Sequence, residues 1–225
     1  MKEWEKALSQ SNSVFVTDFD GTLTTSGSSM HAAARILGSE AEFSRMRDAL
    51  YQQYGKKVLK MMKEESENGQ RRSSLQDLAQ IWWEKQMELY VKKEIKKDIL
   101  YSAAGMLPAR VEGLEILRFC LEEEIPVWIV SAGIKNVIEF WLERHEFREN
   151  RIQILANQIY YENEKPVGHS PVVTICNKAQ RFFESAGALE GKKLVQLGNR
   201  QEDIGWKREN TEEFLIGEEG CILKV

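Results

Sequence analysis

A short apolar strand that ends on two aspartates constrains this chain more than any other feature. Residues 14–17 form a β-branched and aromatic run, Asp18 and Asp20 follow with one residue between them, and Gly21-Thr22 then breaks the pattern. Two carboxylates that leave a buried strand together repel each other and are costly to desolvate. The pair is therefore expected where a cation or a reaction uses it. An Asx-type turn that caps the strand is the structural alternative.

The composition fits a folded protein with a sizeable core. The chain has 225 residues, of which 42% are hydrophobic, and this suits one large domain or a core domain with a smaller inserted one. The net charge is −4 and the isoelectric point is near 5.6, with the basic residues dispersed along the sequence. This balance argues against a nucleic-acid polymer as partner and leaves a small anion open.

Targeting and redox signals are weak. The first residues contain no apolar stretch suited to a signal peptide, and no later window approaches a membrane span, so we expect a cytoplasmic protein with no membrane partner. Cys120, Cys176 and Cys221 lie far apart, which disfavours a disulfide framework or a zinc site. Cys120 is best explained as a core residue on a helix.

A helical pattern between residues 30 and 104 interrupts the α/β pattern that the first strand begins. Apolar residues recur there at helical spacing. We therefore predict an inserted helical cap domain over residues 26–105 and an α/β core domain formed by residues 1–25 and 106–225. A helical bundle that merely packs on the core is the alternative, but a cap in this position can close over the two aspartates and exclude water.

The pattern after the helical block is typical of a parallel sheet. Residues 127–130 form a continuous apolar run, as expected for a strand buried on both faces, and Ser131-Ala132-Gly133 leads into a helix. A strand, a loop of small residues and a helix can together direct backbone N–H groups and a hydroxyl toward an anion. On its own this signal is weak, because many loops of this type contain Ser or Gly.

Further strands are expected toward the end of the chain. Residues 152–155 have a strand pattern, and residues 159–161 and 172–175 suggest a hairpin around a turn at residues 162–166. Residues 193–197 form the last clear core strand. Between the hairpin and that strand, Lys178 stands near the start of a helix, where a cation opposes the helix dipole unless an anion compensates. A solvated surface lysine is the usual alternative.

The segment Asp18-Phe-Asp20-Gly-Thr-Leu resembles the first motif of the haloacid dehalogenase-type phosphatases. The Ser131 loop and Lys178 match the second and third motifs in their order along the chain. The resemblance implies a Rossmann-like core with a parallel sheet, a C1-type helical cap, and phosphate-monoester hydrolysis through an aspartyl phosphate. It implies Asp18 as nucleophile and Asp20 as general acid and base. The phosphate-binding residues that it implies are Thr22, Ser131, Ala132 and Lys178.

The fourth motif of that family is a glycine followed by two acidic residues that hold magnesium. In this chain Gly198 is followed by Asn199, and only Asp203 keeps its charge. The resemblance implies Mg²⁺ as cofactor, bound by the Asp18 carboxylate and the Asp20 backbone carbonyl, with Asn199 or Asp203 completing the oxygen shell.

Other residues narrow the resemblance to the cytosolic pyrimidine, or type III, 5′-nucleotidases. It spans roughly residues 18–203 and is densest between Trp82 and Phe140, where it includes Trp82-Trp83-Glu-Lys and the segment 125–134. It implies a nucleoside monophosphate as substrate and a base-binding glutamate in the cap, which would be Glu65 or its neighbour Glu64. The chain departs from that group at Gly21, where Met is usual, and at Gln86, near an expected base-contacting Ser.

Two other functions stay open from the sequence. One is a phosphatase for a phospho-amino acid or sugar phosphate on the same core, and the other is a binding protein that has lost turnover, as Asn199 would allow. The retained paired carboxylates favour an enzyme. Right-handed crossovers would bring the carboxyl ends of the strands to one edge of the sheet. We therefore expect four residues to cluster there, namely Asp18, Ser131, Lys178 and Asn199. The oligomeric state is left open.

Overall fold

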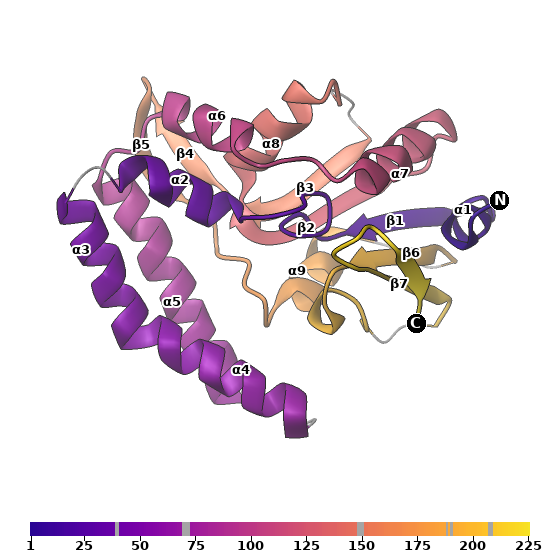
Figure 1. Cartoon of the computed structure of the whole chain (residues 1–225), viewed down its shortest axis with the longest axis horizontal. Coiled ribbons are helices and arrows are strands. Elements are labelled where there is room, and N and C mark those ends of the chain that lie inside the picture. Colours follow the sequence, from indigo (N-terminus) through magenta and orange to yellow (C-terminus); the bar gives the residue numbers. More distant parts are fainter. Residues whose placement is uncertain (39–40, 69–72, 148–150, 188, 190, 207–208) are drawn as a thin grey trace.

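The protein is built around a six-stranded sheet with the strand order β3-β2-β1-β6-β7-β8 (Figure 1). The computed structural model describes residues 1–38, 41–68, 73–147, 151–187, 189, 191–206 and 209–225, with only the backbone described for 65–68. The strands of this sheet are β1 Ser13–Thr17, β2 Val127–Ile134, β3 Ile152–Asn157, β6 Lys193–Gly198, β7 Thr211–Ile216 and β8 Ile222–Lys224. Strands β4 Ile159–Glu162 and β5 Lys165–His169 form a separate antiparallel hairpin.

Most strand pairs in the large sheet are parallel. Strand β1 lies in the middle, between β2 and β6, and is parallel to both, while β8 alone runs antiparallel, on the outer side of β7. Parallel strands end at the same edge, so the loops after β1, β2 and β6 meet there. The predicted α/β core with a parallel sheet is therefore confirmed.

Helices cover both faces of the sheet and form the long insertion between β1 and β2. The helices of the core are α1 Glu3–Leu8, α7 Val111–Glu122, α8 Lys135–Arg144 and α9 Lys178–Ser185, with the short 3₁₀ turn η2 Gln201–Asp203 after β6. The insertion contains α2 Ser29–Leu37, α3 Ala41–Leu50, the π-helical turn η1 Tyr51–Gly55, α4 Lys56–Asn68, α5 Ser73–Lys92 and α6 Lys97–Gly105.

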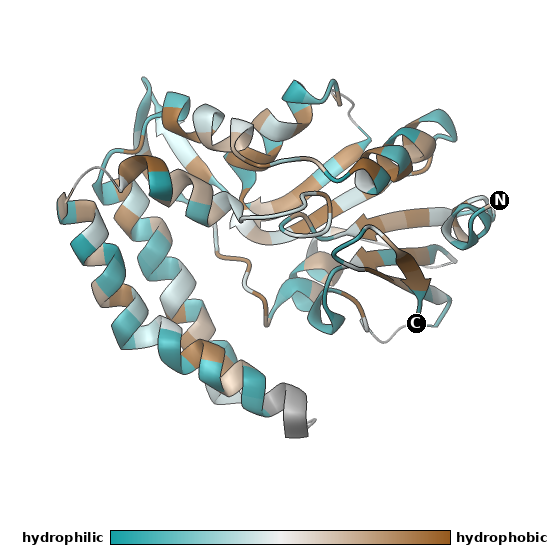
Figure 2. Cartoon of the chain, in the orientation of Figure 1, coloured by the Kyte–Doolittle hydropathy of each residue, from teal (hydrophilic) through white to brown (hydrophobic). Residues whose placement is uncertain are grey.

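The central strand divides its side chains between two apolar clusters. Phe15 belongs to the larger cluster, with residues of α7 and α8, whereas Val14 and Val16 belong to a smaller cluster with Phe182 of α9. Successive side chains of a strand point to opposite faces, so a strand covered on both sides is apolar throughout. Figure 2 shows this apolar colouring along the central strands.

The helical insertion has two parts that differ in how they meet the core. Helix α6 packs against α8 and against α2, whereas α3, η1 and α4 run beside α5 and extend away from the sheet (Figure 1). The predicted cap boundaries at residues 26–105 stay a prediction. Because α6 packs on the core helix α8 and α2 packs on α6 and on β2, the projecting part of the insertion is smaller than that range.

Three strand predictions differ from the structure. Strand β2 does not stop at Val130 but continues to Ile134, with a register shift against β3, because the small side chains of Ser-Ala-Gly permit an extended path there. Residues 172–175 are not a strand: the hairpin partner is β5, and both the N–H and the carbonyl of Val173 are hydrogen-bonded by the Asn157 side chain. The sheet also continues past residues 193–197 into β7 and β8, where polar residues obscure the pattern.

The structure also bears on what the sequence indicated about the cysteines and about membrane-spanning helices. The three cysteines form no disulfide among the described residues, and Cys120 is buried on α7 as expected. None of the helices in the described part of the chain is long and apolar enough to cross a membrane.

Candidate active site

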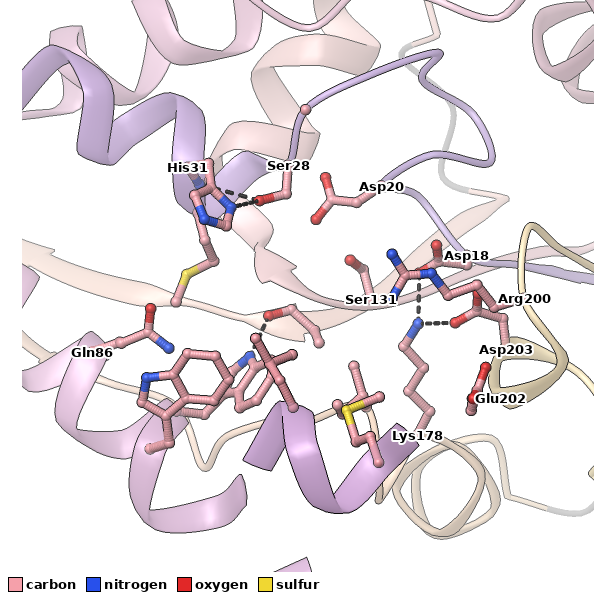
Figure 3. Close-up of a pocket in the computed structure, with 18 of the residues that line it drawn as sticks. Asp18, Asp20, Ser28, His31, Gln86, Ser131, Lys178, Arg200, Glu202 and Asp203 are labelled. Carbon is pink, nitrogen blue, oxygen red and sulfur yellow. Dashed lines mark hydrogen bonds and ion pairs between the residues drawn. The ribbon is translucent and has the colours of Figure 1, made fainter. Parts of the chain in front are cut away.

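A cavity of about 760 Å³ opens at the carboxyl edge of the sheet, between the core and the helical insertion. The sequence motifs meet in it: the residues that line it include Asp18, Asp20, Ser131, Ala132, Lys178, Asn199 and Asp203 (Figure 3). The four residues expected to cluster therefore lie around one space. The chemical roles assigned to them from the sequence stay predictions.

Asp18, at the end of β1, is part of a buried ion-pair network. The Lys178 ammonium lies 2.6 Å from Asp18 Oδ1 and 2.5 Å from Asp203 Oδ1, and all three side chains are almost completely buried. Burial, together with the negative charge of Asp203, raises the pKa of Asp18 to about 7. Burial alone would lower the pKa of Lys178, but the two carboxylates outweigh it and raise that pKa. Lys178 is therefore a permanent cation that faces the first aspartate.

Asp20 is held by a serine that the sequence analysis did not single out. The backbone N–H of Ser29 donates to Asp20 Oδ1 at 2.8 Å, and the Ser29 hydroxyl donates to Oδ2 at 3.1 Å. Burial raises the pKa of Asp20 to about 6, although both bonds from Ser29 act in the opposite direction. A carboxyl group with such a pKa can both give and take a proton near neutral pH. The only signal for Ser29 in the sequence is its place beside the helix-capping Ser28.

Thr22 lies behind the cavity instead of lining it. The side chain is fully buried, and its hydroxyl lies 3.4 Å from Asp18 Oδ2 and 3.2 Å from Asn199 Oδ1. A hydroxyl has one hydrogen, so it donates to one of these oxygens at a time. Thr22 thus connects the first and fourth motifs, whereas the sequence predicted direct phosphate binding.

The loop after Val130 approaches the aspartates closely. The Gly133 N–H donates to Ser131 Oγ at 3.0 Å, which leaves the hydroxyl hydrogen of Ser131 to donate to a ligand. A Cβ atom on Gly133 would lie 1.9 Å from Ser29 Oγ and 2.8 Å from Asp20 Oδ2. Only glycine fits between these groups, so Gly133 sets the distance between the second motif and Asp20.

The far part of the cavity is lined by the helical insertion. Side chains from α2 and α3 to α5 contribute aromatic, apolar and polar groups, among them Met30, His31, Arg47, Tyr51, Met62, Trp82, Trp83 and Gln86. Figure 3 shows Gln86 and His31 on the side of the space away from Lys178. Glu65 falls within α4, but its side chain is outside the described residues. Its neighbour Glu64 is not among the described residues that line the cavity.

The groups around Asp18 fit a hard divalent cation. The carboxyl groups of the buried Asp18 and Asp203 and of the partly buried Asp20 line the same cavity as one buried ammonium, that of Lys178, so acidic groups outnumber basic ones there. The described residues include no group of three His, Cys, Asp or Glu side chains arranged to hold a metal by themselves. A cation would therefore also need an amide or main-chain oxygen, and Asn199 supplies the amide. Oxygen donors of this kind suit Mg²⁺.

The fold is an α/β core with a mostly parallel sheet, and its cavity brings several carboxyl groups together at the carboxyl edge of that sheet. The sequence profile of the haloacid dehalogenase-like hydrolases matches residues 15–205, and the chain belongs to that family. No curated protein sequence matches the chain significantly.

Several solved structures share this fold at low sequence identity. A crystal structure of cytosolic 5′-nucleotidase IIIB bound to cytidine is 18% identical, with a TM-score of 0.64 over 92% of this chain and 72% of that one. A phospho-aspartyl intermediate analogue of phosphoserine phosphatase is also 18% identical, with a TM-score of 0.54 over 86% of this chain and 81% of that one. A substrate-bound phosphoserine phosphatase complex is 17% identical, with a TM-score of 0.55 over 86% and 80%. At these identities the similarity establishes the fold alone.

Proposed function

We propose that the protein is a magnesium-dependent phosphomonoesterase that acts through an aspartyl phosphate, with a nucleoside 5′-monophosphate as substrate. The proposal is supported by the arrangement of Asp18, Asp20 and Lys178 around one cavity and by the family assignment.

In the first step, one carboxylate oxygen of Asp18 attacks phosphorus, and the bond from phosphorus to the ester oxygen breaks. The carboxyl group of Asp20, held by Ser29, gives its proton to the departing alkoxide. The products are the free alcohol and a phosphoryl group on Asp18. The ammonium of Lys178 and the hydroxyl of Ser131 hold the phosphoryl oxygens, where negative charge develops.

In the second step, water attacks phosphorus and the bond from phosphorus to Asp18 breaks. Asp20, now a carboxylate, takes a proton from that water, so phosphate leaves and both aspartates return to their starting states. The cavity under the helical insertion limits access of bulk water to the acyl phosphate.

Magnesium, when bound, would neutralise the phosphate charge and help to orient it toward the nucleophile. The residues that would hold it are Asp18, the main chain of Asp20, and Asn199 or Asp203. The assignment of these residues to a cation is supported by the excess of acidic over basic groups in this part of the cavity.

One observation favours a nucleotide over a smaller phosphomonoester. The cavity continues from Asp18 to a wall that contains Tyr51, Trp82 and Trp83, and it has a volume of about 760 Å³. Aromatic side chains offer flat apolar faces on which a base can stack. The second candidate is a phosphoserine-like substrate, since similar folds occur in phosphoserine phosphatases.

A phosphate-release assay across a substrate panel tests the proposal. We expect hydrolysis of nucleoside 5′-monophosphates that needs added magnesium, with lower kcat/KM for phosphoserine and sugar phosphates. The Asp18→Asn protein, nearly isosteric, serves as the inactive control. A preference for phosphoserine would replace the substrate assignment, and no release from any phosphomonoester would contradict the enzymatic proposal.

A further inference from the structure

The carbonyl oxygen of Ala132 accepts two hydrogen bonds from different parts of the fold. The indole Nε1–H of Trp83, on α5, donates to it at 2.8 Å, and the amide Nδ2 of Asn157, at the end of β3, donates at 2.8 Å. The side chain of Trp83 is largely buried, with 8% of its surface exposed, and its bond to the loop lies at the wall of the cavity. The helical insertion thus contacts the main chain of the predicted phosphate-binding loop directly.

This carbonyl belongs to the same peptide group as the N–H of Gly133. Because a peptide group is planar, fixing the Ala132 oxygen also fixes the direction of that N–H. The same N–H donates to Ser131 Oγ at 3.0 Å. The chain of contacts from the indole to the peptide to the hydroxyl therefore sets which way the remaining hydrogen of Ser131 can point. Hydrogen bonds in such a chain polarise one another.

Helix α5 makes a second contact with the phosphate-binding edge. The Asn177 side-chain amide donates to Gln80 Oε1 at 3.3 Å, and Asn177 directly precedes Lys178. The side-chain oxygen Oδ1 of Asn177 also accepts the Thr174 N–H at 2.7 Å. One helix thus touches the main chain or side chains beside both Ser131 and Lys178.

We propose that Trp83 is a positioning residue for phosphate, which acts through the Ala132 peptide and couples the placement of α5 to the orientation of Ser131. The inference rests on the phosphate site of the proposed function. It assigns the indole N–H a part in binding the phosphoryl group, separate from any contact between the cap and the leaving group. The competing role for Trp83 is direct contact with the leaving group, since its side chain also lines the cavity.

Ligands without a nucleoside leaving group separate the two roles. We would measure the affinity of the magnesium-loaded protein for inorganic phosphate by calorimetry, and KM for acetyl phosphate and a nucleoside monophosphate. Trp83→Phe removes the donor and keeps an aromatic ring. A neutral hydrogen bond contributes about 1 kcal/mol, so phosphate affinity should fall about fivefold, with a similar rise in both KM values.

Two matched variants act as controls. Trp4→Phe removes a buried indole far from the cavity and should leave phosphate affinity unchanged. Trp82→Phe, next to Trp83, should affect only KM for the nucleotide. If Trp83→Phe fails to fold, benzothienylalanine at position 83 keeps the ring shape and lacks only the N–H. That variant should show the same loss.

The possible results distinguish a failure of the inference about Trp83 from a failure of the proposed function. If the unmodified protein binds phosphate and Trp83→Phe or the benzothienyl variant binds it equally well, the inference is overturned and the proposed function stands. A rise in KM confined to the nucleotide would assign Trp83 to direct contact with the leaving group and likewise overturn it. If the unmodified protein binds no phosphate with magnesium present, both the proposed function and the inference fail.

Discussion

At the scale of single residues, the site depends on short polar contacts that fix each carboxylate. Lys178 faces Asp18, and Ser29 holds both oxygens of Asp20. The two aspartates are separated by one residue in the chain, yet each has its own partner. This difference in surroundings suits a nucleophile and a proton donor, because the two roles need different states of the same functional group.

Ser29→Ala tests the positioning of Asp20. The substitution removes the bond to Asp20 Oδ2 and also leaves the Ile134 N–H, which donates to Ser29 Oγ at 3.0 Å, without that acceptor. We expect a loss of about 1–3 kcal/mol in the free energy of unfolding, because a buried donor loses its partner. We also expect kcat to fall about tenfold with little change in phosphate affinity, measured by steady-state kinetics and calorimetry. An unchanged kcat would mean that the backbone N–H of Ser29 is sufficient to position Asp20.

Asn199→Asp tests the metal assignment. An amide oxygen can ligate magnesium but brings no negative charge, so a carboxylate there should bind the ion more tightly. The magnesium concentration for half-maximal phosphate release should therefore fall, which a titration of both proteins measures. An unchanged magnesium requirement would show that position 199 does not contact the metal.

The sequence was informative for charged site residues and uninformative for the residues that hold them. Asp18 and Asp20 stand out because two carboxylates that leave a buried strand are costly without a use, whereas Lys178 was singled out by its place at a helix start and by the family resemblance. Ser29 carries no such signal, since a serine near a helix start is common. Thr22 was expected to bind phosphate, and its buried contact with Asn199 depends on a loop 177 positions away, which local patterns do not reveal.

At the scale of elements, the extended segment that continues β2 past Val130 determines the geometry of the site. Its small residues let the chain pass between Asp20 and the insertion, and Asn157 on β3 holds the loop from the other side. The strand pattern alone predicted β1 and the core of β2 well, because strands covered on both faces are continuously apolar. It missed β7, an outer strand whose Glu212 and Glu213 interrupt the apolar run.

Gly133→Ala tests the importance of this close approach. The added methyl group would overlap Ser29 Oγ and press on Asp20 Oδ2, and both atoms are fixed by hydrogen bonds. We expect at least a hundredfold loss of kcat/KM and a lower melting temperature, measured by phosphate release and thermal denaturation. Gly168→Ala is the matched control, because a Cβ atom there meets no other atom within 4 Å. Near-normal activity of Gly133→Ala would contradict the described packing.

At the scale of the whole molecule, the outer strands are tied to the centre by a small charge network. Glu212 on β7 pairs with the buried Lys193 on β6 and lies 2.6 Å from Lys224 on β8. Hydrogen bonds from Lys193 and Lys224 lower the pKa of Glu212 below its ordinary value. The last strands thus depend on charge as well as on apolar contacts, which local sequence patterns could not show because the three residues are far apart in the chain.

Global stability should accordingly depend on the charge of Glu212. Its pKa is lower in the folded state, so its contribution is present above the ordinary pKa near 4.5 and is lost as the pH falls below that value. Glu212→Gln should lower the free energy of unfolding by about 1 kcal/mol at pH 7, since the group is partly exposed. The substitution should also reduce the loss of stability that acid causes below pH 4.5. Denaturant titrations at several pH values would measure both effects. Equal stability of both proteins at pH 7 would mean that the network contributes nothing.

The most direct test of the account is to trap the phosphoryl group on Asp18. The protein is mixed with magnesium and a nucleoside monophosphate, quenched in acid during turnover, and reduced with borohydride, which converts an aspartyl phosphate to homoserine. Peptide mass spectrometry then locates the modified residue. The account predicts homoserine at position 18 and none in the Asp18→Asn protein. Steady phosphate release with no modification at Asp18, or with modification at another residue, would contradict it.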